Sequence, residues 1–376
     1  MKQKILYVCT IPALEAYSIG LISAAFQSEQ LEVYACIFLA AGEKRNEHQL
    51  LNAFGVPSDQ QDRILFLRLP KSKIVRTLSG GKLLTQVSAY ARSRQIGTVH
   101  FISQDVMLYG HLQLFQGFKV WYTVHDLVPH EAKLSHFQRA KHYYFRIRKD
   151  QGLMAQIPNL VTNSHHQAQA LKSRYPDKHI RYHQMPGLIT PEIEAGTVVP
   201  AELEGISNYV LFFGRIELYK GIDKIYALFS TDPELRSVKL VIAGRGDIYF
   251  ARDQDKEQNI LFLHRFIPDA EISMLFSKAR MFVMPYQSAT QSAVSSLAYH
   301  YRLPVIASNI DGLKDTVLHE QTGLLYQPDD LKALKKQILR LIGDNQFYQQ
   351  LQDNIAGQPF YKTAQLVAEL EEIYSL

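Results

Sequence analysis

The chain has 376 residues, which is long for a single domain, so two domains are expected. Its hydrophobic content of 47% and net charge of +5 describe a globular protein that suits anionic ligands, and they lack the strong basic bias of nucleic-acid-binding proteins. Cys9 and Cys36 lie in apolar runs without a zinc-site spacing and are predicted to be buried thiols. No apolar run reaches membrane-spanning length.

Strand-like apolar runs alternate with helix-period segments in the first half, which predicts parallel α/β architecture. The opening stretch MKQKILYVCT is interpreted as a strand and not as a signal peptide, because its apolar run is brief. The predicted strands are Ile5–Cys9, Glu32–Leu39, Ile64–Leu67, Thr98–Ile102, Val120–Val124 and Leu160–Thr162.

His125 follows the predicted strand in VWYTVHDLVPHEAK. Ligands of open parallel sheets bind at the carboxyl ends of the strands, so His125 is a candidate for hydrogen bonding to a bound ligand. A histidine satisfied by its own loop is the competing interpretation.

The following segment, 133–149, interleaves six basic residues with aromatic ones. It fits equally well a solvated basic helix and a surface that meets anionic lipid or a lipid-diphosphate acceptor.

The stretch 183–205 holds three prolines and three glycines without helical periodicity, which is typical of a linker. We therefore predict an N-terminal Rossmann-like domain over 1–185 and a linker over 186–206. A second Rossmann-like domain would follow over 207–355, and a C-terminal helix over 356–376 would pack back towards the N-terminal domain.

The motif YVLFFGRIELYKGID carries the strongest chemical signal of the second half. A strand ends at Gly214, Arg215 leaves its carboxyl end, and Lys220 stands where the next helix begins. Arginine can bind phosphate oxygens as a fork and lysine adds a point charge, so the pair predicts a diphosphate site. Ordinary surface charges are the alternative.

Two further stretches extend this site. LVIAGRGD ends a strand in a glycine turn, which makes Gly244 and Arg245, together with Arg265, candidates for binding the nucleoside. In YQSATQSAVSSLAY, small polar residues precede a predicted helix from about Ala293 to Tyr301. Because helix N-termini bind anions, Ser292 is a candidate N-cap beside the diphosphate, and Thr290 and Gln291 are candidates for binding the donor sugar.

Neither G-x-G-x-x-G after the first strand nor G-x-x-x-x-G-K-[ST] occurs, so nicotinamide and P-loop interpretations lack their phosphate cradles. Instead FFGRIELYKGID, VIAGRGD, FIPDAEISMLFSKARMFVMPY, LPVIASNIDGLKDTV and TGLLYQPDD resemble, in order and spacing, the carboxyl-terminal domain of the retaining glycosyltransferases of family 4. The resemblance is good over residues 209–342 and loose over the first half. It implies the GT-B fold, with two doubly wound Rossmann-like α/β domains facing a cleft. The domain over 1–185 would lie on the acceptor side, and the domain over 207–355 would bind the nucleotide sugar. His125 could also help to orient the acceptor.

The resemblance also implies residue roles. Arg215 and Lys220 would hold the donor diphosphate, and His125 would contact the donor sugar, which makes these three the candidate catalytic residues. The Glu-x7-Glu segment of the family is replaced here by Ala289 and Leu297. ATQSAVSSLAY is similar to a sub-branch that has Ala-Thr-Gln-Ser-Gly at this place.

The function implied is transfer of a hexose or related sugar, with retention, from a nucleotide-diphosphate donor to a glycan or lipid-linked glycan in surface or exopolysaccharide synthesis. No cofactor and no metal are expected, and the expected location is the cytoplasm or the inner face of the membrane. A non-catalytic GT-B partner or glycan-binding subunit remains an alternative, and a sugar-nucleotide epimerase is a weaker one.

Overall fold

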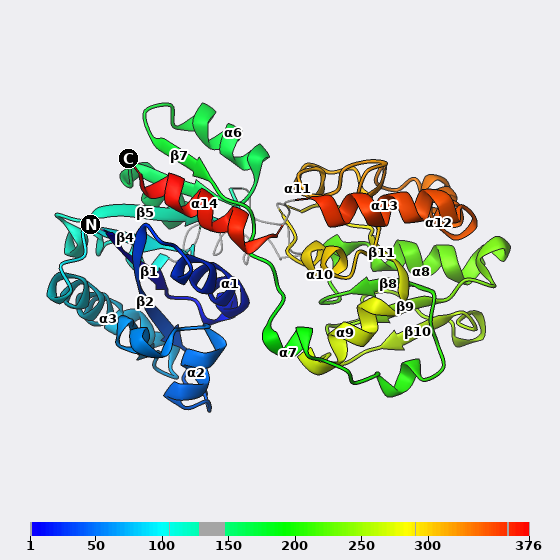
Figure 1. Ribbon diagram of the computed structural model, residues 1–376, viewed down its shortest axis with the longest axis horizontal. Helices are drawn as coiled ribbons and strands as arrows, with labels where there is room; N and C mark the ends of the chain where they lie inside the picture. The colour runs from blue at the N-terminus through cyan, green and yellow to red at the C-terminus, as the bar shows by residue number, and fades with distance from the viewer. Residues whose placement is uncertain (1, 105, 128–146, 290, 359–360, 376) are drawn as a thin grey trace. The chain divides into compact units, whose positions relative to one another are not determined.

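The computed structural model describes residues 2–104, 106–127, 147–289, 291–358 and 361–375. The chain divides into two compact units, coloured along the chain in Figure 1. Unit 1 comprises Met1–Pro186 together with Tyr361–Leu376, and unit 2 comprises Gly187–Phe360. Most of the stretch predicted as a linker thus belongs to unit 2, where its residues Pro191–Glu194 form the short helix α7.

Unit 1 is built on a seven-stranded parallel sheet in the order β3-β2-β1-β4-β5-β6-β7. The strands are β1 (Gln3–Cys9), β2 (Leu31–Leu39), β3 (Ile64–Arg68), β4 (Thr98–Phe101), β5 (Lys119–Val124), β6 (Asn159–Thr162) and β7 (His179–Tyr182). Its helices are α1 (Glu15–Phe26), α2 (Glu47–Ala53), α3 (Lys73–Ser93), α5 (Arg148–Gln156), α6 (His165–Arg174) and α14 (Thr363–Tyr374). The edge strand β7 was absent from the predicted set.

Both faces of this sheet are covered, which explains why its strands are nearly continuous apolar runs. In β1, Ile5 and Tyr7 pack into the core beneath α1, α2 and α14. Leu6 and Val8 point the other way, into the core beneath α3, α5 and α6. Cys9 and Cys36 are buried free thiols, as predicted.

The last helix, α14, packs within unit 1 beside α1 (Figure 1). Its inward side chains Leu366, Leu370, Ile373 and Tyr374 are all buried. Gln184 fixes the chain where it re-enters the unit: its side-chain carbonyl accepts from the Tyr361 amide at 3.0 Å, and its amide donates to the Lys362 carbonyl at 2.8 Å.

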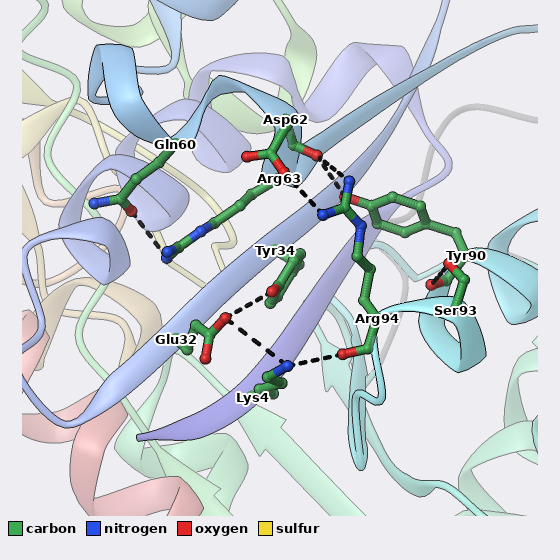
Figure 2. Close-up of polar contacts among 9 residues, drawn as sticks. All are labelled: Lys4, Glu32, Tyr34, Gln60, Asp62, Arg63, Tyr90, Ser93 and Arg94. Atoms are coloured by element: carbon green, nitrogen blue, oxygen red, sulfur yellow. Dashed lines mark hydrogen bonds and ion pairs between the residues drawn. The ribbon is translucent and has the colours of Figure 1, made fainter. Parts of the chain in front are cut away.

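The amino edge of the unit 1 sheet is fastened by a polar network (Figure 2). The Lys4 ammonium donates to the Arg94 carbonyl at 2.9 Å and lies 4.0 Å from Glu32, whose carboxylate accepts from Tyr34. The Arg94 guanidinium in turn binds Asp62 at 2.8 Å. The network ties the end of α3 to β1, β2 and the turn before β3.

Unit 2 is built on a six-stranded parallel sheet in the order β10-β9-β8-β11-β12-β13. The strands are β8 (Tyr209–Phe213), β9 (Leu240–Ala243), β10 (Ile260–Leu263), β11 (Ala279–Met284), β12 (Val305–Ser308) and β13 (Gly323–Tyr326). The helices after α7 are α8 (Ile222–Thr231), α9 (Asp269–Ser277), α10 (Ser295–His300), α11 (Asp311–Lys314), α12 (Leu331–Gly343) and α13 (Asn345–Gly357). Two parallel, Rossmann-like sheets confirm the predicted α/β class.

No helix in the part of the chain that the structure describes is long and apolar enough to cross a membrane.

The packing of α14 predicts a stability effect. Leu370→Ala should lower the free energy of unfolding by about 2–5 kcal/mol, because it leaves a cavity beneath a fully buried side chain. Glu372→Ala, on the exposed side of the same helix, should change it by less than about 0.5 kcal/mol. Urea denaturation of the full chain measures both, and equal effects would contradict the packing described.

Candidate functional site

The candidate site lies at the carboxyl end of β8, which is flanked by β9 and β11. Gly214 follows β8 with φ +133°, and an added Cβ there would lie 3.0 Å from the Lys220 ammonium nitrogen. Gly244, after β9, has φ +149°, and a Cβ there would collide with the Gly214 carbonyl. The two glycines therefore let the backbones approach closely and leave room for the lysine side chain.

Lys220 is the most unusual charge of the site. Its side chain is only 7% exposed, and its ammonium lies 5.8 Å from the ring centre of Tyr219 and 5.6 Å from that of Tyr286. Burial lowers the pKa of Lys220 to about 8; Glu217 opposes this shift and Arg215 adds to it. None of the ion pairs found among the described residues includes Lys220. A buried ammonium without a carboxylate is costly, and an anionic ligand would offset that cost.

Arg215 supplies a second, exposed cation. Its side chain is 71% exposed, and its Nε lies 3.4 Å from the Glu217 carboxylate, an ion pair that contributes little in water. Both cations follow the carboxyl end of β8, and the charge of Arg215 adds to the lowering of the Lys220 pKa.

The segment after β11 adds neutral polar groups. Burial raises the pKa of Tyr286 to about 12, and the nearby Ser292 hydroxyl opposes this shift. The Gln291 side-chain carbonyl is buried and accepts no hydrogen bond from the described residues. A buried acceptor without a donor is costly, and a ligand hydroxyl that reached it would offset that cost. The predicted sugar-binding residue Thr290 lies outside the described residues.

The predicted helix start is wrong. α10 begins at Ser295, not near Ala293, and its N-cap is Val294, which makes no side-chain capping bond. Ser292 does not cap it; instead the Ser292 carbonyl accepts from the Ser295 hydroxyl at 2.9 Å. Residues between β11 and α10 thus form a longer loop than the sequence pattern suggested, and α10 has only six residues.

The three predicted nucleoside residues differ in their surroundings. Arg245 is exposed, with its guanidinium 5.5 Å from the ring centre of Phe266. Arg265 instead binds Glu202 at 2.8 and 2.9 Å and Glu271 at 2.7 Å, which raises the pKa of the guanidinium further. This double ion pair gives Arg265 a structural role that links the segment before β8 to α9. Gly244 serves the backbone packing already described.

His125 lies in unit 1, directly after β5. Its ring is 9% exposed, its Nε2 is 2.9 Å from the Ile102 carbonyl, and the Tyr17 ring packs edge-on at 4.8 Å. Burial lowers the pKa of His125, so the ring is neutral near pH 7. Donation from Nε2 to the carbonyl leaves Nδ1 as an acceptor.

Two glutamines that sequence reasoning missed hold the His125 loop. The Gln104 carbonyl accepts from the amides of His125 and Asp126 at 3.0 and 2.9 Å. The Gln167 amide donates to the His125 carbonyl at 2.9 Å. Both residues are far from the loop in sequence, so no local pattern could reveal them. Tyr219 and Tyr286 were also missed, although both follow strands of unit 2.

Of the basic segment 133–149, residues 133–146 lie outside the described residues. In the portions of the chain that are described, no group of three or more histidine, cysteine or acidic side chains is placed to hold a metal.

Residues 201–358, which contain this site, match the family model described as "Glycosyl transferases group 1". Unit 2 is therefore similar to a glycosyl transferases group 1 domain. Solved structures of glycosyltransferases share the fold of this chain. Sucrose-phosphate synthase from Thermosynechococcus elongatus is 17% identical, with 99% of this chain and 98% of that chain covered and a TM-score of 0.70. HepE from Anabaena in complex with UDP-glucose is 16% identical, with 99% and 100% covered and a TM-score of 0.68. The fold is GT-B.

Among curated relatives, the capsular polysaccharide biosynthesis glycosyltransferase CapM of Staphylococcus aureus is 25% identical over 178 residues, which is 45% of this chain and 46% of CapM. The chain matches about a third to a half of the length of such relatives.

The buried lysine predicts a pH-dependent stability. Lys220→Met should raise the free energy of unfolding at neutral pH by about 1–3 kcal/mol, because it removes a buried charge. The folded pKa is near 8 and the ordinary value is 10.5, so between these pH values the unfolded chain binds the proton more tightly. Wild-type stability therefore rises with pH through this window, and the advantage of methionine shrinks.

Urea denaturation of both proteins below, within and above the window tests this expectation. Lys239→Met replaces an exposed lysine of unit 2 and serves as the matched control. A Lys220→Met variant that is less stable than the wild type at neutral pH would show that the lysine already has an anionic partner in the folded protein.

Proposed function

We propose that the protein transfers a sugar, with retention of configuration, from a nucleotide-diphosphate donor to a glycan acceptor. The observation that carries this proposal is the buried Lys220 ammonium, which lies 5.8 and 5.6 Å from two tyrosine ring centres, has no ion pair among the described residues and feels the charge of the exposed Arg215. The group 1 glycosyl transferase domain supports it, as does the fold shared with a structure that binds UDP-glucose.

The proposed chemistry follows from the charges. When the glycosidic bond to the donor breaks, negative charge develops on the departing diphosphate, and preorganised cations lower the energy of that state. Lys220 is protonated below its pKa of about 8, and it lies in a site from which water is largely excluded. Arg215 adds a fork of donors at the exposed side. These two residues supply the positive charge themselves, so we propose that transfer needs neither a metal nor a cofactor.

The acceptor class is proposed from the similarity to CapM, whose name places it in capsular polysaccharide synthesis. We therefore propose that the acceptor is a growing surface or exopolysaccharide glycan, free or lipid-linked. Action at the cytoplasmic face of a membrane belongs to the same proposal. The neutral His125, with Nδ1 as an acceptor, is suited to hydrogen bonding with a hydroxyl and not to charge stabilisation.

A second candidate is a non-catalytic GT-B partner or glycan-binding subunit. It is favoured by Leu297, which is buried in the core. Family 4 glycosyltransferases, which the sequence resembles, have the second glutamate of their motif at this position. Thermal shift with UDP-, GDP- and dTDP-sugars separates the candidates, because a purely structural subunit should gain no stability from nucleotide. An epimerase, the third candidate, would convert its sugar nucleotide without any acceptor.

The proposed role of Arg215 and Lys220 predicts a loss of catalysis when either cation is removed. Lys220→Ala or Arg215→Ala should lower turnover by about 10²–10³-fold, the usual cost of removing one charge-stabilising donor from an active site. Donor hydrolysis or transfer is measured with each member of the sugar-nucleotide panel, and the wild type is also measured with EDTA. The exposed Lys239→Ala variant, at the opposite end of the sheet, is the matched control.

Turnover within a few-fold of wild type in a folded Arg215→Ala, Lys220→Ala double variant would refute the proposed role of these two cations. Activity lost with EDTA and restored only by a divalent metal would refute metal independence.

The unpaired side-chain carbonyl of Gln291 predicts an effect on binding of the donor sugar. Gln291→Ala should weaken use of the intact sugar nucleotide about tenfold and leave the affinity for the bare nucleotide unchanged, because the buried carbonyl lacks a protein donor. Donor kinetics and calorimetric nucleotide affinity are compared for the same variant, with the exposed Gln258→Ala as control. Equal changes in both quantities, or none, would show that Gln291 does not contact the sugar.

A further inference from the structure

Helix α3 has two apolar faces, and only one of them is used by the fold. Leu84, Val87 and Ala91 are buried in the core of unit 1. At the other end of the helix, Ile74, Val75 and Leu78 are 73%, 50% and 80% exposed. Since each residue turns a helix by about 100°, Ile74 and Leu78 lie one turn apart on a face rotated by roughly 100° from Leu84. The exposed face is therefore not a continuation of the core face.

The exposed face is surrounded by positive charge. Residues 71–82 contain four lysines and arginines and no acidic residue, and the whole of α3 contains none. Lys71 and Lys82 are exposed, and neither takes part in any ion pair found among the described residues. The other end of the helix differs, because Arg94 is bound to Asp62 there (Figure 2).

The exposed apolar face lies near the carboxyl edge of the unit 1 sheet. α3 follows β3, so its first turns start from the carboxyl edge of the sheet. His125 follows β5 and therefore stands at the same edge, because all strands of the sheet are parallel. The exposed apolar face and the candidate acceptor residue thus belong to one end of unit 1.

We propose that the first turns of α3, which we call the α3 face (residues 71–82), dock on the surface of an anionic phospholipid bilayer. Ile74, Val75 and Leu78 would enter the boundary between headgroups and acyl chains, and Lys71 and Lys82 would meet lipid phosphates. Aliphatic side chains flanked by lysines are typical of helices that lie in a membrane interface.

A protein partner fits this face less well. Lysine is depleted at protein interfaces, and specific interfaces bury about 800 Å² on each side. Three aliphatic side chains cover far less than that. The proposal does not rest on the proposed sugar transfer; if both hold, docking would bring the carboxyl edge of unit 1 to a lipid-linked acceptor.

The test is co-sedimentation of the full chain with phosphatidylcholine vesicles, with and without phosphatidylglycerol. The wild type should bind only the anionic vesicles, and high salt should weaken binding. Ile74→Ser with Leu78→Ser should weaken it at least tenfold. Lys71→Gln with Lys82→Gln should weaken it by a similar factor, since each cation near such a surface is worth roughly fivefold in affinity.

Matched controls are Val198→Ser, an isolated exposed aliphatic in unit 2, and Lys172→Gln, an exposed lysine on α6. Neither should change vesicle binding. The α3 variants should keep the wild-type melting temperature and nucleotide-induced shift, which separates this test from that of the sugar transfer.

Absence of wild-type binding to anionic vesicles, or unchanged binding by both α3 double variants, would overturn the proposal. So would a wild-type dimer in sedimentation analysis that the Ile74→Ser, Leu78→Ser variant lacks, because the face would then meet a second copy of the chain.

Discussion

The burial of the Lys220 ammonium without a counter-ion is the constraint on which the candidate site depends. A lysine in this position destabilises the fold, as its lowered pKa shows, and no carboxylate of the described residues pairs with it. Weak cation–π attraction to the rings of Tyr219 and Tyr286 offsets part of this cost. A dianionic diphosphate would interact far more strongly with the same charge, so in the proposed transfer the binding energy would be concentrated on the leaving group.

This arrangement needs space that only the backbone can provide. Gly214 and Gly244 have φ values of +133° and +149°, a region in which residues with a Cβ are strained. Because the β8 and β9 chains continue to hydrogen bond through these residues, with Gly214 N 3.0 Å from the Ala243 carbonyl, the sheet keeps its pairing up to the site. Gly244, which the sequence suggested as a nucleoside-binding residue, is thus first a packing requirement of the candidate site.

Sequence patterns predicted the parts of the structure that depend on local signals. Apolar runs located the first six strands of unit 1 and the strands β8 and β9 of unit 2, and the Gly214, Arg215 and Lys220 spacing located the two cations. The short edge strand β7 was missed because His179–Tyr182 has little apolar character. Ser292 was predicted as a helix cap because it is a good capping residue, yet the helix starts three residues later. Arg265 looked free because Glu202, one of its partners, is 63 residues away in sequence.

The two units differ in the kind of interaction that they offer. Unit 2 presents the charges of Lys220 and Arg215, whereas the buried histidines of unit 1 are held neutral: burial lowers the pKa of His125 and of His183, the latter to about 4. His183 is hydrogen bonded through Nδ1 to the Gln184 carbonyl at 2.8 Å, and Gln184 is the residue that fixes the start of α14. The hydrogen-bonding environment of unit 1 therefore depends on the last helix of the chain. α14 also supplies Tyr374, whose hydroxyl is hydrogen bonded to Nδ1 of the buried His100, so the last helix completes the polar contacts of this core.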